Sequence, residues 1–391
     1  MTRVDVAVIG GGIHGAGMAQ AAAAAGHSVL LLEERALASG SSSRSSKLIH
    51  GGLRYLESAQ LRLVHESLHE RSTLLRLAPE LVRLRRFYIP VYRQTRRRPW
   101  QLRAGLSMYA VLAAFRTGAR FGTLPRHRWG ELEGLRTQDL QAVFWYQDGQ
   151  TDDALLTAAV MRSAESLGAR LAMPGEFIAA ELRPDGVTVH YRDGEAAERE
   201  LHARVLVNAA GPWAAAVAQR VTPRIEVPKL ELVQGSHLLL DWPARDYCFY
   251  VESPRDGRAI FFMPRHGRTL VGTTEVRFRG DPRLAAASPN ELNYLLGVAR
   301  HYFGAEAARQ RVLEIFAGLR VLPAGSGHAF HRSRETLLLP DAALRPRVLS
   351  IYGGKLTTWR AVSVRALRMI AGSLPRRRLR ARTDELPLTP A

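Results

Sequence analysis

Apolar and polar residues follow two periods along this chain, and each period predicts a different kind of element. Near the N-terminus, the apolar runs 4–9 and 28–32 flank an alanine-rich segment that ends at Gly26. Short apolar runs next to glycine predict buried strands, and the alanine-rich segment predicts a helix between them. The chain therefore opens with a predicted strand, helix and strand, and Glu33 follows directly.

Helical periodicity returns in three long segments, residues 61–78, 152–167 and 289–303. Pro79 follows the first segment and Gly168 follows the second, and both residue types end helices. Thr151 or Asp152 is suited to cap the second helix. A last helix, to about Ile370, is predicted where a strand and a glycine turn at 348–354 repeat the pattern of the opening.

Strand patterns fill most of the remaining chain. Residues 169–207 predict a meander with turns at 184–186 and 193–194, and its apolar last strand suits a buried parallel sheet beside the first two strands. Residues 230–242, 247–252, 258–263 and 268–272 predict an antiparallel sheet on the substrate side of a cleft, and 83–92 and 311–322 predict further strands. The predicted class is α/β with α+β character, a Rossmann-like domain interleaved with an antiparallel-sheet domain.

Composition is that of a globular protein, with 46% hydrophobic and 23% charged residues among 391. Cys248 is the single cysteine, so an intrachain disulfide is excluded. No apolar run approaches the roughly 20 residues that span a bilayer, and the first strand begins too early to leave room for a signal peptide. We therefore expect a cytoplasmic protein of more than one domain.

The net charge of +19 suggests an anionic partner. Arginines crowd residues 83–120, where no Asp or Glu occurs, and residues 376–382. Beyond Trp100, apolar residues at helical spacing (Leu102, Leu106, Tyr109) create an apolar face beside this positive charge. Such a segment suits either an anionic membrane surface or a helix packed on its own domain, and both interpretations stay open. A nucleic-acid partner is not expected, because no finger, RNP-like or helix-turn-helix signature occurs.

Two stretches carry the candidate chemistry. Gly10, Gly12 and Gly15 have the G-x-G-x-x-G spacing that lets a turn close, a pyrophosphate approach and a helix pack on a strand. Glu33, 21 positions after Gly12, is placed to bind a ribose hydroxyl. The serine- and glycine-rich stretch 39–55 offers amides, hydroxyls and longer donors to a ligand. Together they predict a dinucleotide site. No metal site is predicted.

Six collinear motifs resemble the FAD-dependent glycerol-3-phosphate dehydrogenases, which have the D-amino-acid-oxidase-like flavoprotein fold. The motifs are GGGIHGAG (10–17), SSKLIHGGLRYL (45–56), GSH (235–237), GTT (272–274), GLR (318–320) and GGKLTT (353–358). The resemblance implies oxidation of sn-glycerol 3-phosphate, a small phosphorylated alcohol, to dihydroxyacetone phosphate. It further implies electron transfer from FAD to quinone, and peripheral association with the inner face of the cytoplasmic membrane.

The resemblance also assigns the site residues. The predicted FAD contacts are Gly10, Gly12, Ile13, His14, Gly15, Glu33, Ser45, Ser46, Lys47, His50, Gly51, Gly52, Ala210, Gly211, Trp213, Gly354, Lys355, Leu356 and Thr357. Arg54 and Arg334 are expected to bind phosphate with help from Tyr55, since arginine forks suit a phosphate dianion. His237 is expected to accept the hydroxyl proton, Arg320 to polarise the reacting oxygen, and Lys355 to lie beside flavin and substrate.

The implied FAD-binding domain is discontinuous and comprises residues 1–78, 150–215 and 345–391. Residues 79–149 form the basic, possible membrane-facing segment, and 216–344 the substrate domain. Family members usually carry a further C-terminal helical domain, whereas this sequence ends at Ala391. Gln234 replaces a usual lysine, Glu275 a usual aspartate and Leu155 a common arginine, so an altered substrate site is expected. The oligomeric state stays open.

Two other functions fit the same residues. One is an oxidase that passes electrons from a related hydroxy or amino substrate to oxygen, because sequence does not separate electron acceptors. The other is a catalytically impaired flavin-binding remnant that acts by binding a partner. Retention of Arg54, His237, Arg320 and Lys355 disfavours the remnant, since a binding module does not need them.

Overall fold

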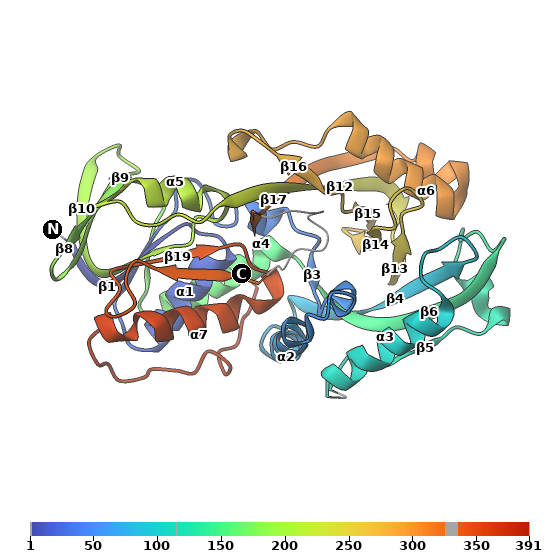
Figure 1. Cartoon of the computed structure of the whole chain (residues 1–391), viewed down its shortest axis with the longest axis horizontal. Helices are drawn as coiled ribbons and strands as arrows, with labels where there is room; N and C mark the ends of the chain where they lie inside the picture. Colours follow the sequence, from blue (N-terminus) through green and yellow to red (C-terminus); the bar gives the residue numbers. More distant parts are fainter. Residues whose placement is uncertain (1, 115, 325–334, 391) are drawn as a thin grey trace.

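The computed structural model describes residues 2–114, 116–324 and 335–390, and these build two β-sheets that lie side by side with helices packed against them (Figure 1). The first sheet has nine strands in the order β11-β8-β9-β10-β1-β2-β7, with β19 also on β10 and β18 on β19. Its strands are β1 (Thr2–Ile9), β2 (Val29–Leu32), β7 (Arg170–Ala172), β8 (Gly175–Arg183), β9 (Gly186–Asp193), β10 (Glu198–Asn208), β11 (Val221–Thr222), β18 (Leu337–Pro340) and β19 (Val348–Tyr352).

The centre of this sheet is parallel, because β1 pairs in parallel with both β2 and β10, and β19 pairs in parallel with β10. Helices α1 (Ile13–Ala24), α4 (Asp153–Ser166) and α7 (Trp359–Ile370) pack together beside it. The alanine-rich sequence of α1 permits this close packing. A Cβ at Gly17 would lie only 2.5 Å from the Trp359 ring, so a larger residue there would separate α1 from α7.

The second sheet has ten strands in the order β16-β12-β15-β14-β13-β4-β6-β3, with β17 on β12 and β5 on β6. It is antiparallel except where β13 meets β4. Its strands are β3 (Leu48–Ile49), β4 (Val82–Tyr92), β5 (Phe121–Thr123), β6 (Leu140–Thr151), β12 (Leu230–Pro243), β13 (Tyr247–Glu252), β14 (Ala259–Arg265), β15 (Arg268–Gly272), β16 (Val276–Phe278) and β17 (Val312–Pro323).

Helices cover the second sheet from both sides. In Figure 1, α2 (Leu61–Leu77) and α3 (Pro99–Leu112) lie below it and α6 (Pro289–Arg309) lies above it. Aromatic residues fill the layer under α6, where Phe303 packs against Phe249 and Phe262 at centroid distances of 5.0 and 4.9 Å. The short helix α5 (Ala214–Gln219) follows β10. Among the described helices, none combines the length and apolar character that a membrane span requires.

The predicted elements and the α/β class are confirmed. Helices α2, α4 and α7 occupy the expected segments, and Asp152 caps α4 by accepting hydrogen bonds from the amides of Ala154 and Leu155, each at 3.0 Å. The predicted turns at 184–186 and 193–194 connect β8 to β9 and β9 to β10. Strand β6 was not predicted, although it pairs with β4 along its whole length.

Candidate active site

A cavity of about 420 Å³ lies between the two sheets and takes residues from both. The predicted site residues that line it are Gly10, Gly12, Ile13, His14, Glu33, Ser45, Ser46, His50, Gly52, Arg54, Tyr55, Ala210, Gly211, Trp213, His237, Arg320, Gly354, Lys355, Leu356 and Thr357. Gly15, Lys47 and Gly51 lie outside this lining, and Arg334 falls outside the described residues. Residues scattered over the whole sequence thus meet around one space.

The glycine turn after β1 leaves no room for side chains. Gly10 has a φ of 102°, which favours glycine, and a Cβ on Gly15 would lie 1.8 Å from the Gly10 carbonyl oxygen. The turn delivers the N-terminus of α1 to the cavity, where the Ile13 amide donates to Ser42 Oγ at 2.9 Å. A helix N-terminus with a close backbone approach is the geometry that binds a pyrophosphate.

Glu33 stands at the end of β2 and faces the same cavity. Its carboxylate accepts hydrogen bonds from the backbone amides of Gly11 at 2.6 Å and Arg35 at 3.0 Å. These bonds hold the acid beside the glycine turn, as binding a ribose next to a pyrophosphate requires. The cavity residues therefore fit FAD by their own geometry.

His14 joins the two glycine turns of the cavity. A Cβ on Gly354, whose φ is 108°, would lie 2.2 Å from His14 Nε2, so the ring packs directly on that backbone. Burial lowers the pKa of His14 to about 4. The ring is therefore neutral at physiological pH and adds no charge to the pyrophosphate end of the site.

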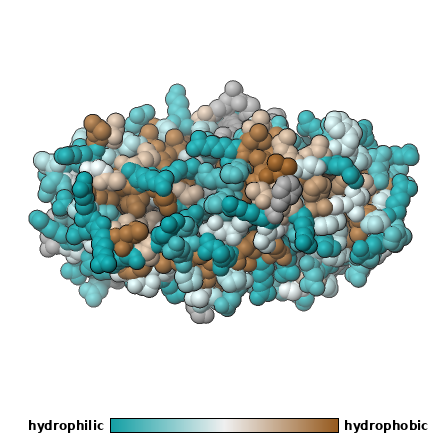
Figure 2. Space-filling model, turned by 90° about the horizontal axis from the view of Figure 1, so that it is seen from below, coloured by the Kyte–Doolittle hydropathy of each residue, from teal (hydrophilic) through white to brown (hydrophobic). Residues whose placement is uncertain are grey.

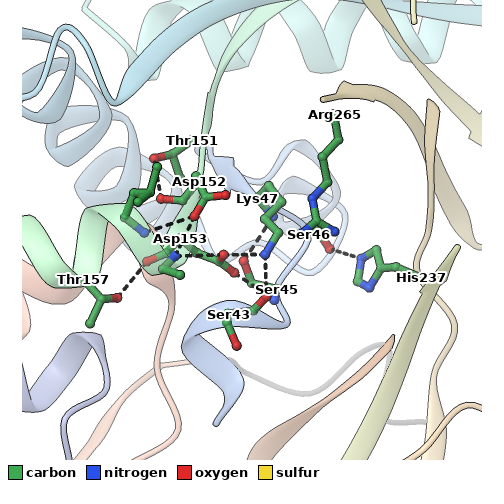
Figure 3. Close-up of polar contacts among 12 residues, drawn as sticks. Ser43, Ser45, Ser46, Lys47, Thr151, Asp152, Asp153, Thr157, His237 and Arg265 are labelled. Atoms are coloured by element: carbon green, nitrogen blue, oxygen red, sulfur yellow. Dashed lines mark hydrogen bonds and ion pairs between the residues drawn. The ribbon is translucent and has the colours of Figure 1, made fainter. Parts of the chain in front are cut away.

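The Ser/Gly-rich stretch is fastened to α4 by a buried ion pair (Figure 3). The Lys47 ammonium binds the Asp153 carboxylate and the Ser43 carbonyl, and Asp153 also accepts from the Ser45 amide at 3.0 Å. The Lys47 and Asp153 side chains are 4% and 0% exposed. Lys47 thus shapes the loop that carries Ser45 and Ser46, and a direct contact of Lys47 with FAD stays a prediction.

Lys355 connects the second glycine turn to the same loop. Its ammonium donates to the carbonyls of His50 at 3.1 Å and Gly51 at 3.3 Å and to Ser67 Oγ at 3.0 Å, and it lies 4.9 Å from the Tyr55 ring centroid. Unlike Lys47, Lys355 lines the cavity. It therefore places a fixed positive charge at the wall of the site.

His237, on β12, is the candidate proton acceptor. Its ring is 1% exposed and stacks on Phe316 with a centroid distance of 5.0 Å. Its Nε2 lies 3.0 Å from Ser46 Oγ. Figure 3 draws this contact as a dashed line. Burial, assisted by the charges of Arg320, Lys47 and Arg265, lowers the pKa of His237 well below 6.5. The imidazole is consequently neutral and able to accept a proton at physiological pH.

Arginines supply the positive charge of the cavity. Arg320 donates to Thr273 Oγ1 at 3.2 Å and lies 3.8 Å from the Glu275 carboxylate. The Arg54 guanidinium lies 5.0 Å from the Tyr55 ring centroid. Burial lowers the pKa of Arg54, but Tyr55, Glu275 and Tyr250 outweigh burial, so the net pKa is raised. Arg54 therefore keeps its charge inside the site.

Three residues outside the prediction shape this region. Arg258 lines the cavity and lies 3.5 Å from Glu275. Glu291, at the start of α6, accepts from Ser236 Oγ at 2.7 Å and from Thr274 Oγ1 at 2.6 Å. Asp148, two residues after the cavity-lining Tyr146 on β6, pairs with the fully buried Arg71. No local sequence signal marks Arg258 or Asp148, because Glu275 and Arg71 are distant in the chain, whereas Glu291 also belongs to a local capping box with Ser288.

The cation replacements noted in the sequence do not alter the cavity lining. Gln234 is buried and donates to Glu291 Oε2 at 2.8 Å, and Leu155 is 51% exposed on α4. Neither position lines the cavity. Glu275, which replaces a usual aspartate, does line the cavity. It is therefore the only one of the three replaced positions that belongs to the site.

Several known proteins are similar to this chain. Residues 5–358 match the family described as FAD dependent oxidoreductase. Glycerol-3-phosphate dehydrogenase of Pseudomonas aeruginosa is 38% identical over 369 residues, which cover 93% of this chain and 70% of the relative. D-erythritol 1-phosphate dehydrogenase of Brucella abortus is 35% identical over 376 residues, with 95% and 74% covered. The aerobic glycerol-3-phosphate dehydrogenase of Escherichia coli is 35% identical, with 94% and 73% covered.

Solved structures share the fold. The glycerol-3-phosphate dehydrogenase of Bacillus halodurans, complexed with FAD, has a TM-score of 0.74 and 26% identity, over 99% of this chain and 68% of that one. This protein is therefore an FAD-dependent oxidoreductase with FAD as its cofactor. Within that class, the chain belongs to the family of the FAD-dependent glycerol-3-phosphate dehydrogenases, which confirms the resemblance found in its motifs.

Proposed function

We propose that this protein oxidises sn-glycerol 3-phosphate to dihydroxyacetone phosphate. The observation that carries the proposal is the convergence of His237, Arg320, Arg54 and Tyr55 on the cavity that also holds the pyrophosphate turn. When bound, FAD supplies the hydride acceptor. The roles below are those of the protein's own side chains.

Proton removal is assigned to His237, whose neutral ring accepts the proton of the substrate's secondary hydroxyl. Arg320 stabilises the negative charge that grows on the same oxygen, because a fixed cation in a water-poor site does so at little reorganisation cost. Thr273 and Glu275 hold the Arg320 guanidinium at the cavity wall. Base and cation thus act on one oxygen from strands β12 and β17.

Phosphate binding is assigned to Arg54 and Tyr55, which are adjacent in the chain and stacked on each other. The guanidinium fork suits the dianion. Arg334 is proposed to complete this site from the segment outside the described residues. Lys355 adds charge beside flavin and substrate from the helix-side glycine turn.

A second phosphorylated polyol is a specific alternative. The relative from Brucella abortus, named D-erythritol 1-phosphate dehydrogenase, is almost as similar as the first glycerol-3-phosphate dehydrogenase, at 35% against 38% identity. Both names describe the oxidation of a short polyol carrying one phosphate. The phosphate site proposed above suits either substrate, and the alternatives differ in the number of hydroxyl-bearing carbons.

Quinone is the proposed electron acceptor, and the membrane surface is the proposed place of transfer. Helix α3 supports transfer at the membrane surface because it has two apolar faces. Leu102, Leu106 and Tyr109 are buried inward, while Trp100, Met108 and Val111 are 70%, 47% and 61% exposed. Arginines lie in the sequence before and within the helix. An exposed apolar face with basic neighbours suits the headgroup region of an anionic bilayer.

Anaerobic reduction of the bound flavin tests the proposed reaction. Bleaching of the flavin absorbance by glycerol 3-phosphate, but not by glycerol or a small hydroxy acid, is expected, and erythritol 1-phosphate separates the two polyols. Bleaching by none of the phosphate esters would reject the proposal. Peroxide yield in air then distinguishes oxygen from quinone as the acceptor.

Replacing Arg320 tests the assigned cation. R320A is expected to retain FAD and to lose flavin reduction by a factor of roughly 10² or more, since the cation acts mainly in the transition state. R268A is the matched control, because Arg268 is half-exposed and pairs with Asp241 on the surface. Normal reduction in R320A would contradict the assignment.

A further inference from the structure

Arg54 and Tyr55, the proposed phosphate ligands, lie on a single 3₁₀ turn, η2 (Leu53–Leu56). Such a turn is held by few hydrogen bonds of poor geometry, so its position depends on what surrounds it. Gly52, directly before η2, has a φ of 84°, and residues 57–59, directly after η2, are exposed. The turn therefore needs contacts beyond its own backbone to hold the two ligands at the cavity.

One such contact is made by Arg97, which lies two residues before α3. Its guanidinium binds the Glu57 carboxylate at two points, Nε with Oε1 and Nη2 with Oε2, the second at 3.0 Å. The third nitrogen, Nη1, donates to Glu252 Oε2 at 2.7 Å. Glu57 directly follows η2, and Glu252 is the last residue of β13. One arginine thus joins the phosphate-binding turn to the antiparallel sheet.

This arrangement differs from an ordinary surface ion pair, which contributes little. The side chains of Arg97 and Glu252 are only 16% and 12% exposed, and all three guanidinium nitrogens are used. Two-point binding of a carboxylate fixes the direction of the guanidinium as well as its distance. Glu252 is itself held, because its other oxygen accepts from the Arg96 amide at 2.6 Å. Glu57 is therefore bound to a partner that has a defined position.

The ion pairs of Arg97 also lie close to the cavity, as Tyr250 shows. This tyrosine is two positions before Glu252 on β13, is buried and lines the cavity. Burial raises the pKa of Tyr250, and the positive charges of Arg97 and Arg54 both act on it in the opposite direction. One buried side chain of the cavity wall is thus within electrostatic range of both arginines.

We propose that Arg97 is a positioning residue for substrate binding. Through Glu57 and Glu252 it holds η2 in the geometry in which the two ligands on that turn bind the phosphate. Arg97 does not line the cavity, so it acts through the residues that it holds. The inference deepens the proposed function and rests on it, since it concerns the affinity of the same phosphate site.

Hydrogen exchange of the FAD-loaded protein tests the position of η2 without any substrate. The amides of Tyr55 and Ala59 donate to carbonyls of this region at 2.9 and 3.1 Å. In R97A and in E57A these amides are expected to exchange about tenfold faster than in the wild type, because η2 opens more often. R128A is the matched control, since Arg128 forms a two-point ion pair of the same kind and does not line the cavity.

Flavin reduction over a range of glycerol 3-phosphate concentrations measures the effect on the site. R97A and E57A are each expected to raise the apparent Kd of the substrate about tenfold, within the range for coupled members of one ion-pair network. The limiting rate is expected to stay within about twofold, because His237 and Arg320 lie on β12 and β17 rather than on η2. R97K keeps the charge without the fork and is expected to restore little of the affinity.

E57A separates positioning from simple attraction between charges. Removing the negative charge of Glu57 would by itself favour an anionic substrate, whereas the loss of positioning weakens binding. The inference is overturned if both variants exchange at the wild-type rate, or if E57A binds glycerol 3-phosphate as tightly as the wild type or more tightly. Glu57 is exposed, so E57A decides the question even if R97A fails to fold.

The exchange measurement keeps this inference separate from the proposed reaction. If exchange at η2 rises as expected but no phosphate ester bleaches the wild-type flavin, the proposed function fails and the hold of Arg97 on η2 stands. If the esters bleach the wild-type flavin and the apparent Kd is unchanged in both variants, the proposed function stands and the positioning role of Arg97 fails.

Discussion

Burial holds the His14 ring neutral inside the folded protein, and this links stability to pH. The pKa of His14 is lowered from 6.5 to about 4. Below pH 6.5 the unfolded chain therefore takes up a proton that the folded chain refuses. The stability contributed by the neutral ring is complete above pH 6.5 and is lost as the pH falls toward 4.

We predict that H14Q flattens this dependence. Between pH 6.5 and 4.5 the wild type is expected to lose up to about 1.4 kcal/mol per pH unit more unfolding free energy than H14Q, which has no titrating group at that position. Urea unfolding of the FAD-loaded proteins at several pH values measures both slopes. Equal slopes would show that the folded protein accepts the proton on His14.

A single methyl group on Gly272 is predicted to disable the base. In G272A the added Cβ would stand 2.1 Å from His237 Cδ2 and 2.7 Å from Cγ, so the ring must move. Displacement by about 1 Å costs on the order of 10² in rate, and that loss of flavin reduction is expected with FAD still bound. G297A, in α6, is the control because no atom lies within 4 Å of its added Cβ. A normal rate in G272A would contradict the placement of His237.

The hydrogen bonds of Glu291 to β12 could not be predicted from the sequence. Its partners on β12, Gln234 and Ser236, lie 57 and 55 positions away. The glycine motif of Gly10 to Gly15 was recognisable because its strand, turn and helix are adjacent in sequence. The spacing of Ser288 and Glu291 is a local capping-box pattern, but no local pattern marks the donors on β12 that the same carboxylate collects. Only the folded chain identifies those donors.

Glu291 joins the start of α6 to β12 and to Thr274, which follows β15. Its replacement is predicted to weaken the packing between these segments. E291Q puts an amide N–H₂ where hydroxyl, amide and backbone donors now converge, so at least one buried donor loses its acceptor. The expected loss is about 2 kcal/mol of unfolding free energy. S288A removes the helix cap and one hydroxyl donor to Glu291, and it is expected to cost about 1 kcal/mol. Equal unfolding midpoints for E291Q and wild type would contradict this role.

Strand β6 escaped prediction for a related reason. Its apolar residues Val143, Phe144 and Tyr146 are buried, but the buried Asp148 interrupts the apolar pattern. Asp148 is tolerated there because Arg71 and Tyr109, from α2 and α3, satisfy its oxygens. A buried charge that is paired can therefore occur in a core strand, and an analysis of the hydrophobic pattern does not predict that strand.

The two sheets are held around the cavity by contacts between distant segments. Lys47 with Asp153 and Lys355 with the His50 and Gly51 carbonyls join the loop 39–55 to α4 and to the last glycine turn. The C-terminal arginines also take part, since Arg377 lies 3.3 Å from Asp5 at the first strand. Arg377 keeps a 48% exposed side chain, so this contact lies at the surface. Positive charge in this chain is partly internal fastening and partly exposed surface.

Exposed arginines, among them Arg93, Arg96 and Arg98, precede α3 in the sequence. The helix lies along the lower side of the molecule in Figure 1. Seen from below, this side carries apolar patches interspersed with hydrophilic residues (Figure 2). The inward face of α3 packs on its own domain, which is one of the two interpretations drawn from the sequence. The outward apolar face is exposed, and we propose that it contacts the membrane surface.

We predict that this protein binds vesicles containing anionic lipid and that the binding weakens as salt is raised from low ionic strength to 0.5 M. W100S combined with M108S removes two of the three exposed apolar side chains of the outward face, and at roughly 25 cal/mol per Å² the vesicle partition coefficient should fall about tenfold or more. L155S combined with M173S is the matched control, since it removes two similarly exposed apolar side chains, at 51% and 43%, that lie outside α3. Sedimentation with vesicles measures both variants, and equal loss in the two would assign the binding to general surface hydrophobicity rather than to α3.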